Sequence, residues 1–104
     1  MTPREQLATV GAHLLDRDGI EPGTMMGYPC LRKDGRFFAS LNKEGSALIV
    51  KLPASRVKAA VASGEGVPFA PNGRVFREWL AVPTSLGDSW SAMLDEALAS
   101  SETP

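Results

Sequence analysis

Apolar residues recur at intervals of three and four positions in three parts of the chain, which is the spacing of one helix face. The first part begins at Thr2, the second covers 54–63, and the third, which has the strongest pattern, begins at Thr84. Capping residues precede the first and third parts, and Gly19 and Gly64 end the first and second. The apolar positions of these three predicted helices are Leu7, Val10, Gly11, Leu14 and Leu15; Val57, Ala60 and Val61; and Leu86, Trp90, Met93, Leu94, Ala97 and Leu98.

Between the helices, short apolar runs bounded by Gly, Pro and Asn predict strands. Residues 24–32 are interpreted as one strand with an irregular centre, because Gly27 and Pro29 weaken a regular ladder. Strands are also predicted over 36–41 and over 46–52, and the latter is expected to be the most buried. Three strands joined by short turns form an antiparallel meander. The turns expected around them are 21–23, 33–36, where Asp-Gly favours a hairpin, and 42–45.

The longest run of β-branched and aromatic residues lies at 73–83 and predicts a long strand. A short extended piece at 67–69 and a turn at 71–73 precede it. Each face of this predicted strand is apolar except for one central charge, Arg77 on one face and Glu78 on the other. A buried strand does not carry charges without partners, so we look here first for a function beyond packing.

The elements follow one another in the order helix, three strands, helix, strand, helix. This order predicts a single α+β domain over residues 1–99, with a mainly antiparallel sheet and the helices packed on one face. Residues 100–104 are polar and are expected to form a flexible tail.

The composition is that of a soluble globular domain, with 43% of the 104 residues hydrophobic and 22% charged. A chain of this length buries a core without the help of a metal or a disulfide. The lone cysteine, Cys30, has no partner for an internal bridge, and no apolar run approaches the ~20 residues of a membrane span. Charged residues interrupt the N-terminal region, which argues against a secretory leader. We therefore expect a cytoplasmic protein that does not enter the membrane.

The net charge of −1 conceals a gradient along the chain. Residues 1–29 carry −2, residues 30–77 carry +6 and residues 78–104 carry −5. A basic segment is the electrostatic footprint of nucleic-acid binding. The alternative is that the acidic final helix partly neutralises a basic sheet and helix. We favour this alternative, because dedicated nucleic-acid-binding domains are usually basic overall.

Residues suited to catalysis or metal binding are sparse. The single histidine, His13, lies off the apolar stripe of its helix and is expected to face solvent. One histidine and one cysteine fall short of a zinc site, and no Ser-His-Asp set can be assembled. The glycines around Glu65 lack the Gly-Lys-Ser/Thr ending of a phosphate loop. We therefore expect a protein that is not an enzyme and that binds no cofactor or metal.

Arg77, Trp79 and Lys51 are the main binding candidates. In the predicted strand Arg77 and Trp79 share a face, and Lys51 ends a neighbouring strand. A cation beside an indole makes a platform for an anionic or aromatic partner. The alternative, which we favour, is structural, with Arg77 paired to an acidic side chain across the sheet and Trp79 packed under a helix. Arg36 and Arg74 are further candidates within the basic segment.

Cys30 is the one candidate redox thiol. Arg32, two residues further along the strand, shares its face, and basic neighbours activate a thiol. The alternative is that Cys30 is a small apolar strand residue with no chemical role.

Several short motifs follow one another in a recognisable order: 25–39 with its Met-Met-Gly opening, Gly-Arg hairpin and phenylalanine strand; 47–52; Val67-Pro68-Phe69; Trp79-Leu80-Ala81-Val82-Pro83; and a final helix with Trp90. Their order and spacing resemble the N-terminal domain of the TfoX/Sxy family over about residues 24–98, and the YjbR/MmcQ group has a similar layout. The resemblance implies a non-catalytic regulator, since proteins of this family act as co-activators in natural competence. The second, helical domain of the longer members has no counterpart in this sequence, which leaves the competence role open.

Two hypotheses about function follow from the sequence. The first is a small regulatory or protein-interaction domain that binds a protein partner, or forms a homodimer through an exposed strand such as residues 25–32. The second is an accessory nucleic-acid-binding domain that uses the basic segment 30–77.

Overall fold

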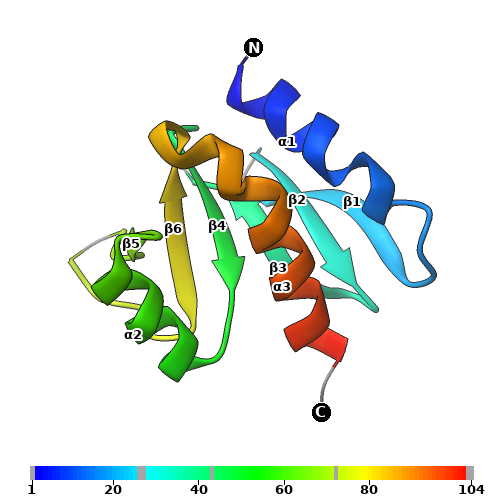
Figure 1. The fold of residues 1–104 in the computed structure, drawn as a ribbon. Coiled ribbons are helices and arrows are strands. Elements are labelled where there is room, and N and C mark those ends of the chain that lie inside the picture. Colours follow the sequence, from blue (N-terminus) through cyan, green and yellow to red (C-terminus); the bar gives the residue numbers. More distant parts are fainter. Residues whose placement is uncertain (1, 26–27, 43, 72, 103–104) are drawn as a thin grey trace.

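The computed structural model of the protein describes residues 2–25, 28–42, 44–71 and 73–102. Within these ranges the chain forms three α-helices, two 3₁₀-helices and six strands (Figure 1). The helices are α1 (Pro3–Gly11), α2 (Ala54–Ser63) and α3 (Trp90–Glu102), with 3₁₀-helices at Ala12–Leu14 and Thr84–Ser89. The strands are β1 (Ile20–Met25), β2 (Tyr28–Lys33), β3 (Arg36–Leu41), β4 (Ala47–Lys51), β5 (Val67–Pro68) and β6 (Trp79–Pro83).

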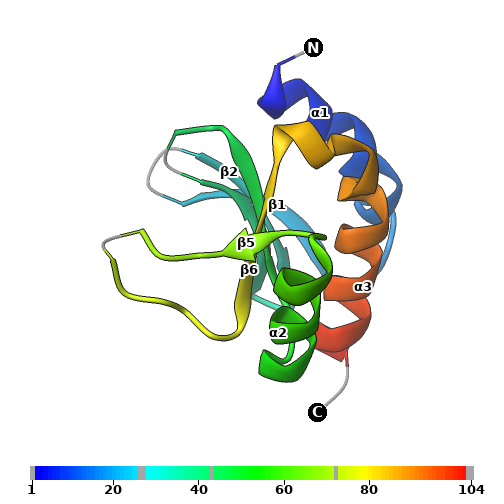
Figure 2. The ribbon, with the colours of Figure 1, turned by 60° about the vertical axis from the view of Figure 1, so that its left-hand side comes forward.

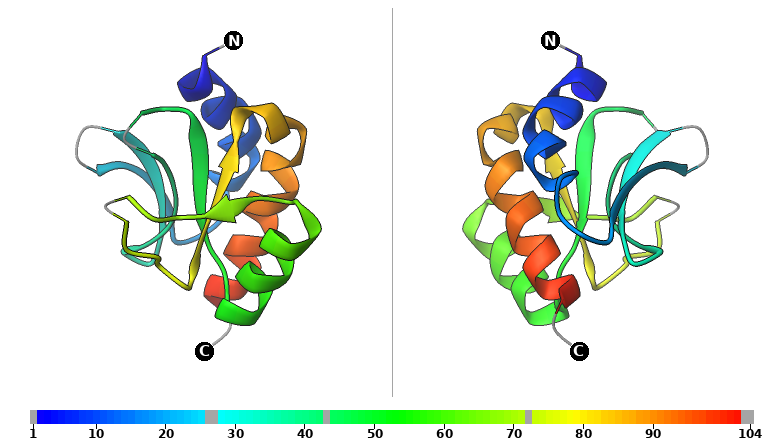
Figure 3. Two further views of the ribbon diagram at one scale, coloured as in Figure 1. Left: turned by 90° about the vertical axis from the view of Figure 1, so that its left-hand side faces the viewer. Right: turned by 90° about the vertical axis from the view of Figure 1, so that its right-hand side faces the viewer.

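The six strands form one antiparallel sheet in the order β1-β2-β3-β4-β6-β5. The three α-helices lie on one face of this sheet, and the chain that connects β5 to β6 extends on the other side (Figures 2 and 3). The predicted fold class, an α+β domain with an antiparallel sheet and helices on one face, is therefore confirmed.

The main core lies between the helices and the sheet. Trp90 and Leu94 of α3 are fully buried there, together with Leu48 and Val50 of β4. The indole N–H of Trp90 donates to the carbonyl oxygen of Val82 at 3.1 Å, so its burial leaves no unpaired donor. The predicted apolar helix positions are buried or half-buried with two exceptions, both beside or within 3₁₀ segments where the 3.6-residue period no longer holds. These exceptions are Leu15 and Leu86.

Two of the predicted signals at helix ends act as expected, whereas the predicted cap of the third helix at Thr84 is wrong, because Thr84–Ser89 forms a 3₁₀-helix without a side-chain cap and α3 begins only at Trp90. The hydroxyl oxygen of Thr2 accepts a hydrogen bond from the N–H of Glu5 at 3.2 Å and so caps α1. Gly64 ends α2 in the left-handed conformation, with φ of +81°, which glycine adopts without strain. The bounds of α2 are those predicted.

The prediction of one strand over 24–32 is wrong. The segment belongs to two strands, β1 and β2, which pair as a hairpin from Ile20 opposite Lys33 to Met25 opposite Tyr28. The predicted turn at 21–23 lies inside β1. Proline and glycine are tolerated there because β1 is an edge strand.

The predicted Asp-Gly hairpin is confirmed, because Asp34 and Gly35 both have positive φ, as a type I′ turn requires. Beyond it, β3 contains a bulge. Leu31 pairs with Ala39 but Arg32 pairs with Phe37, which leaves Phe38 without a partner. Phe38 is fully buried in the core. Phe37 is half-buried opposite Arg32, whose guanidinium lies 5.9 Å from the centre of its ring.

The prediction of a long strand over 73–83 is also wrong, because only Trp79–Pro83 forms a strand. We call residues 69–78 the β5–β6 loop. Its two ends are joined by a hydrogen bond from the N–H of Phe76 to the carbonyl oxygen of Phe69, at 3.0 Å. Arg77 and Glu78 lie in an exposed turn before β6. Their charges are therefore exposed to water. The expectation that both charges lie within a buried strand is wrong.

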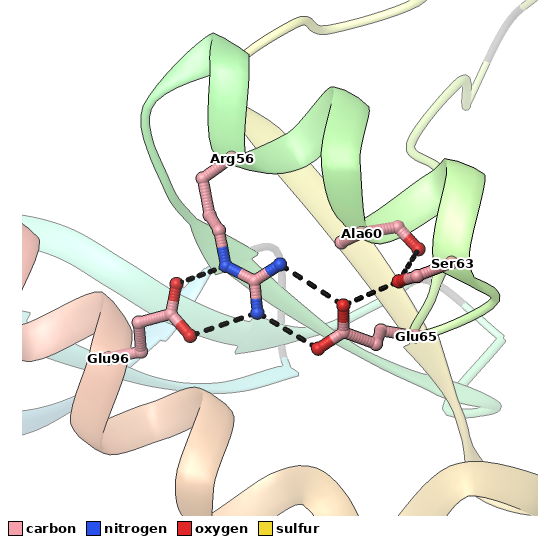
Figure 4. A network of polar contacts seen from close by, with 5 residues as sticks. All are labelled: Arg56, Ala60, Ser63, Glu65 and Glu96. Carbon is pink, nitrogen blue, oxygen red and sulfur yellow. Dashed lines mark hydrogen bonds and ion pairs between the residues drawn. The ribbon is translucent and has the colours of Figure 1, made fainter.

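Arg56 of α2 joins three parts of the fold (Figure 4). Its guanidinium donates to both oxygens of Glu65, at 2.9 and 3.1 Å, and to the carboxylate of Glu96 in α3. The hydroxyl of Ser63 also donates to Glu65. These bonds tie α2 to α3 and to the turn that leads into β5.

Helix α3 continues to Glu102, so residues 100–102 are helical and not part of a flexible tail. None of the helices within the described ranges is long and apolar enough to cross a membrane. Some residues of the predicted strand, turns and tail lie outside the described residues, namely Met26, Gly27, Lys43, Asn72, Thr103 and Pro104.

Candidate functional site

An apolar surface covers the β5–β6 loop and the neighbouring part of the sheet. Within the described residues, five large hydrophobic side chains are exposed, and three of them belong to this surface. They are Val67, Val75 and Phe76, with exposed fractions of 47%, 56% and 39%. We use the name loop surface for the side chains of Val67, Phe69, Arg74, Val75, Phe76 and Trp79.

The β5–β6 loop extends on the side of the sheet that carries no helix (Figure 3). Ile49 alternates along β4 with Leu48 and Val50, which pack in the main core, and therefore points to the opposite face. On that face Ala47, Ile49 and Ala81 form a small second cluster. Phe69 and Trp79 pack against this cluster.

Two aromatic rings link the loop to the cluster. The ring centres of Phe69 and Phe76 are 5.6 Å apart, with the planes tilted by 33°. Since Phe69 packs on the cluster and Phe76 lies beside Phe69, the apolar contact is continuous from the sheet to the exposed end of the loop.

Three cations lie within or next to the loop surface. Arg74 lies with its guanidinium 5.9 Å from the ring centre of Phe76, and Lys51 is the cross-strand partner of Trp79. Arg77 is exposed in the turn before β6. Within the described residues no ion pair involves any of these three cations. The nearest acidic residue in the sequence is Glu78, which follows Arg77. The structure thus brings Lys51 and Trp79 together as the sequence predicts, but Arg77 lies in a turn before β6 and not within the strand.

The structural alternative for Trp79, packing under a helix, is wrong. Trp79 lies on the face without helices and is half-buried, so it does not pack under a helix. Its cross-strand partner in β4 is Lys51.

A second feature, which we call the basic cleft, lies where the ends of several elements meet. It has a volume of about 550 Å³. Three cations line it, from the β2–β3 hairpin and the end of β4. One carboxylate from the turn before β6 and two hydroxyls from the last turn of α3 complete the polar lining. These polar side chains are Lys33, Arg36, Lys51, Glu78, Ser100 and Ser101.

Sequence reasoning found Arg36 and Lys51 but not the cleft that they share. The two serines were expected in the flexible tail, although the helical spacing from Ala97 and Leu98 continues into them. The start of α2 at Ala54 also lines the cleft. The β2–β3 hairpin, the start of α2 and the end of α3 come together only through tertiary packing. No local sequence motif predicts that arrangement.

Cys30, the candidate redox thiol, is only 2% exposed in β2. Burial raises the pKa of its thiol above the usual range, and the positive charge of Arg32 opposes that change only in part. A protonated, shielded thiol is a poor nucleophile. The environment of Cys30 therefore favours a packing role.

His13 is exposed as expected, and its Nε2 lies 2.9 Å from a carboxylate oxygen of Asp95 in α3. The contact joins the 3₁₀-helix Ala12–Leu14 to α3 at the surface, and neither residue lines the basic cleft. Within the part of the chain that the structure describes, no group of three or more His, Cys, Asp or Glu side chains is arranged to hold a metal ion.

Comparison of the chain with models of protein families, with curated proteins and with solved structures found no match.

Proposed function

We propose that the protein is a small non-catalytic interaction domain whose loop surface binds a protein partner. The observation that carries this proposal is the gathering of exposed apolar side chains, Val67, Val75 and Phe76, on β5 and the loop that follows it. An exposed apolar patch beside half-buried aromatic residues is typical of an interface.

The chemistry of the partner follows from the charges around this patch. Lys51, Arg74 and Arg77 surround it and make no ion pair with the described residues. Complementary charges at the rim of an interface direct association and exclude wrong partners. We therefore expect a protein whose contact surface is apolar at its centre and acidic at its edge.

A homodimer formed through residues 25–32 does not fit the fold. Strand β2 is paired on both sides, so the edge strand at this end of the sheet is β1. That edge carries Glu21 and Pro22, and a charge and a proline on an edge strand both oppose the addition of another strand.

The resemblance to the TfoX/Sxy N-terminal domain supports a regulatory role for this interaction, within the cytoplasm. Two of the motifs that carry the resemblance, Val67-Pro68-Phe69 and the Trp79–Pro83 segment, border the β5–β6 loop. A regulatory partner bound at this loop is consistent with both the family resemblance and the exposed apolar side chains.

The test uses the double variant Val75→Ser/Phe76→Ser in an affinity purification from cells that make the protein. A partner recovered with the wild type is then purified, and its dissociation constant is measured by calorimetry at low and high salt. We expect the double variant to bind at least about ten-fold more weakly, because central apolar contacts dominate binding. Binding is also expected to weaken with salt.

Leu86→Ser is the matched control, since Leu86 is also an exposed apolar residue but lies outside the loop surface. It is expected to bind the partner like the wild type. Val75→Ser alone guards against misfolding of the double variant, because Val75 is the most exposed of these side chains. Equal affinity of the wild type and both loop variants would contradict the proposal.

Single-stranded nucleic acid is a second candidate for the same surface. Phe69, Phe76 and Trp79 lie among cations, and aromatic rings with basic neighbours bind stacked bases. We place it second because the net charge is −1 and the most exposed side chains are valines, which do not stack. Titration of a labelled oligonucleotide at low salt tests it, and the absence of binding there removes this candidate.

A further inference from the structure

We propose that the basic cleft binds a phosphate group carried by a small organic molecule. The cleft shares the cation Lys51 with the edge of the loop surface, but none of the exposed apolar side chains proposed to bind the partner lines it. Its volume of about 550 Å³ lies within the range of small-molecule sites.

The charges of the cleft favour an anion. Three cations line it against the single carboxylate of Glu78. Lys33 is held in place because its Nζ donates to the carbonyl oxygen of Asp18 at 2.8 Å, and its charge is partly balanced by the carboxylate of Asp34 at 3.8 Å. Arg36 and Lys51 are exposed, and the structure shows no ion pair or hydrogen bond from their side chains to the described residues. Two positively charged donors therefore face the cleft with their hydrogen-bonding capacity unused.

The start of α2 adds a backbone contribution to this arrangement. Pro53 precedes the helix, and no side chain caps its first N–H groups. Pro53 and Ala54 both line the cleft. The unpaired N–H groups of a first helical turn attract anions, so they act in the same sense as Arg36 and Lys51.

The rest of the lining suits the organic part of the ligand. Phe37 and Leu52 are apolar members of the cleft wall, and Arg32 lies 5.9 Å from the ring centre of Phe37. Ser101 donates its hydroxyl hydrogen to the carbonyl oxygen of Ala97 at 3.0 Å, which leaves its oxygen free to accept. The end of α3 is therefore able to accept hydrogen bonds from hydroxyl groups of a ligand, whereas the cations hold the phosphate.

The experiment is a titration of the full chain, labelled with ¹⁵N, followed by NMR. The probes are inorganic phosphate, adenosine monophosphate and a ten-residue oligothymidylate. We expect saturable shifts of the amide signals of Arg36, Lys51, Ala54 and Ser100 with adenosine monophosphate. Arg36→Gln is expected to weaken this binding about ten-fold, which is the usual effect of removing a charge-assisted hydrogen bond.

Lys58→Gln is the matched control, because Lys58 is an exposed cation of α2 that does not line the cleft. It is expected to bind the probes like the wild type. Arg36 is exposed, so the Gln variant is expected to keep the fold.

The outcomes separate the sources of the phosphate. Saturable binding of adenosine monophosphate that Arg36→Gln weakens supports a free small molecule. Binding of the oligonucleotide alone, at the same residues and with the same sensitivity, supports phosphate recognition but places the phosphate in a polynucleotide. The absence of saturable shifts with all three probes, or equal affinity of Arg36→Gln and the wild type, overturns the proposal. The double variant Val75→Ser/Phe76→Ser is expected to bind adenosine monophosphate like the wild type. This result would show that phosphate binding in the cleft is independent of partner binding at the loop surface.

Discussion

At the scale of single residues, Arg56 connects more of the fold than any local pattern indicates. Its guanidinium lies between two carboxylates, Glu65 in the turn after α2 and Glu96 in α3 (Figure 4). The two acidic groups are held close to one cation, so its removal leaves two like charges near each other. The same hydrogen bonds raise the pKa of Arg56 above its usual value, and the side chain stays charged throughout the accessible pH range.

Replacement of Arg56 by Met is therefore expected to lower the free energy of unfolding by about 1 to 2 kcal/mol, since hydrogen bonds to charged groups are lost while the apolar stem is kept. The measurement is urea unfolding followed by circular dichroism. Lys58→Met on the same helix is the control and is expected to change the free energy by less than about 0.5 kcal/mol. Equal midpoints for the two variants would show that the network does not stabilise the fold.

Glu65 makes the same network sensitive to acid. The hydrogen bonds from Arg56, and then from Ser63, lower the pKa of Glu65 to about 2 from an ordinary value of 4.5. Because the folded-state pKa is the lower one, the stabilisation is complete above pH 4.5 and is lost as the pH falls toward 2. Melting temperatures measured between pH 5 and about 2 test this. We expect the wild type to lose more stability than Glu65→Gln over this interval, and parallel curves would contradict the assignment.

At the scale of elements, the error over 73–83 has a simple physical cause. Strand β4 pairs with β6 from Ala47 to Lys51, and Pro53 then directs the chain into α2. Residues 73–78 therefore have no neighbouring strand, and their high β-propensity is not used. In contrast, α2 and the Asp-Gly hairpin were predictable because capping and turn chemistry act within a few residues.

The link from α2 to β5 shows a second limit of sequence reasoning, at Gly66. This residue is buried, and an added Cβ would lie 2.8 Å from the carbonyl oxygen of Ala81 and from the side chain of Leu80. Only the paired position of β6 reveals this close approach. The glycine is needed for space and not for a left-handed conformation.

Gly66→Ala is expected to lower the free energy of unfolding by about 2 kcal/mol, because a backbone atom cannot move aside as a side chain can. Gly45→Ala is the comparison, since its Cβ would meet open space and its cost of about 1 kcal/mol comes from its positive φ alone. Thermal unfolding of both variants provides the measurement. A smaller loss for Gly66→Ala than for Gly45→Ala would mean that β5 moves away from β6 at little cost.

At the scale of the whole molecule, the charge gradient is only partly neutralised. Arg56 and Glu96 join the basic segment to the acidic final helix, as the alternative reading of the gradient requires. Arg36, Lys51, Arg74 and Arg77 make no such pair with the described residues. The sequence identified these four cations, but tertiary packing places Arg36 in the basic cleft, Arg74 and Arg77 at the loop surface, and Lys51 at both.

The two tryptophans of the chain occupy contrasting environments, which gives the protein its own optical probes. Trp90 is fully buried in the core, and its indole N–H is hydrogen-bonded to the carbonyl oxygen of Val82. Its fluorescence emission is therefore expected at short wavelength until the whole domain unfolds. Trp79 is half-buried beside Lys51 on the loop surface, where a quencher in solution reaches it. Fluorescence of the unlabelled chain thus reports global unfolding through Trp90 and contact at the loop surface through Trp79.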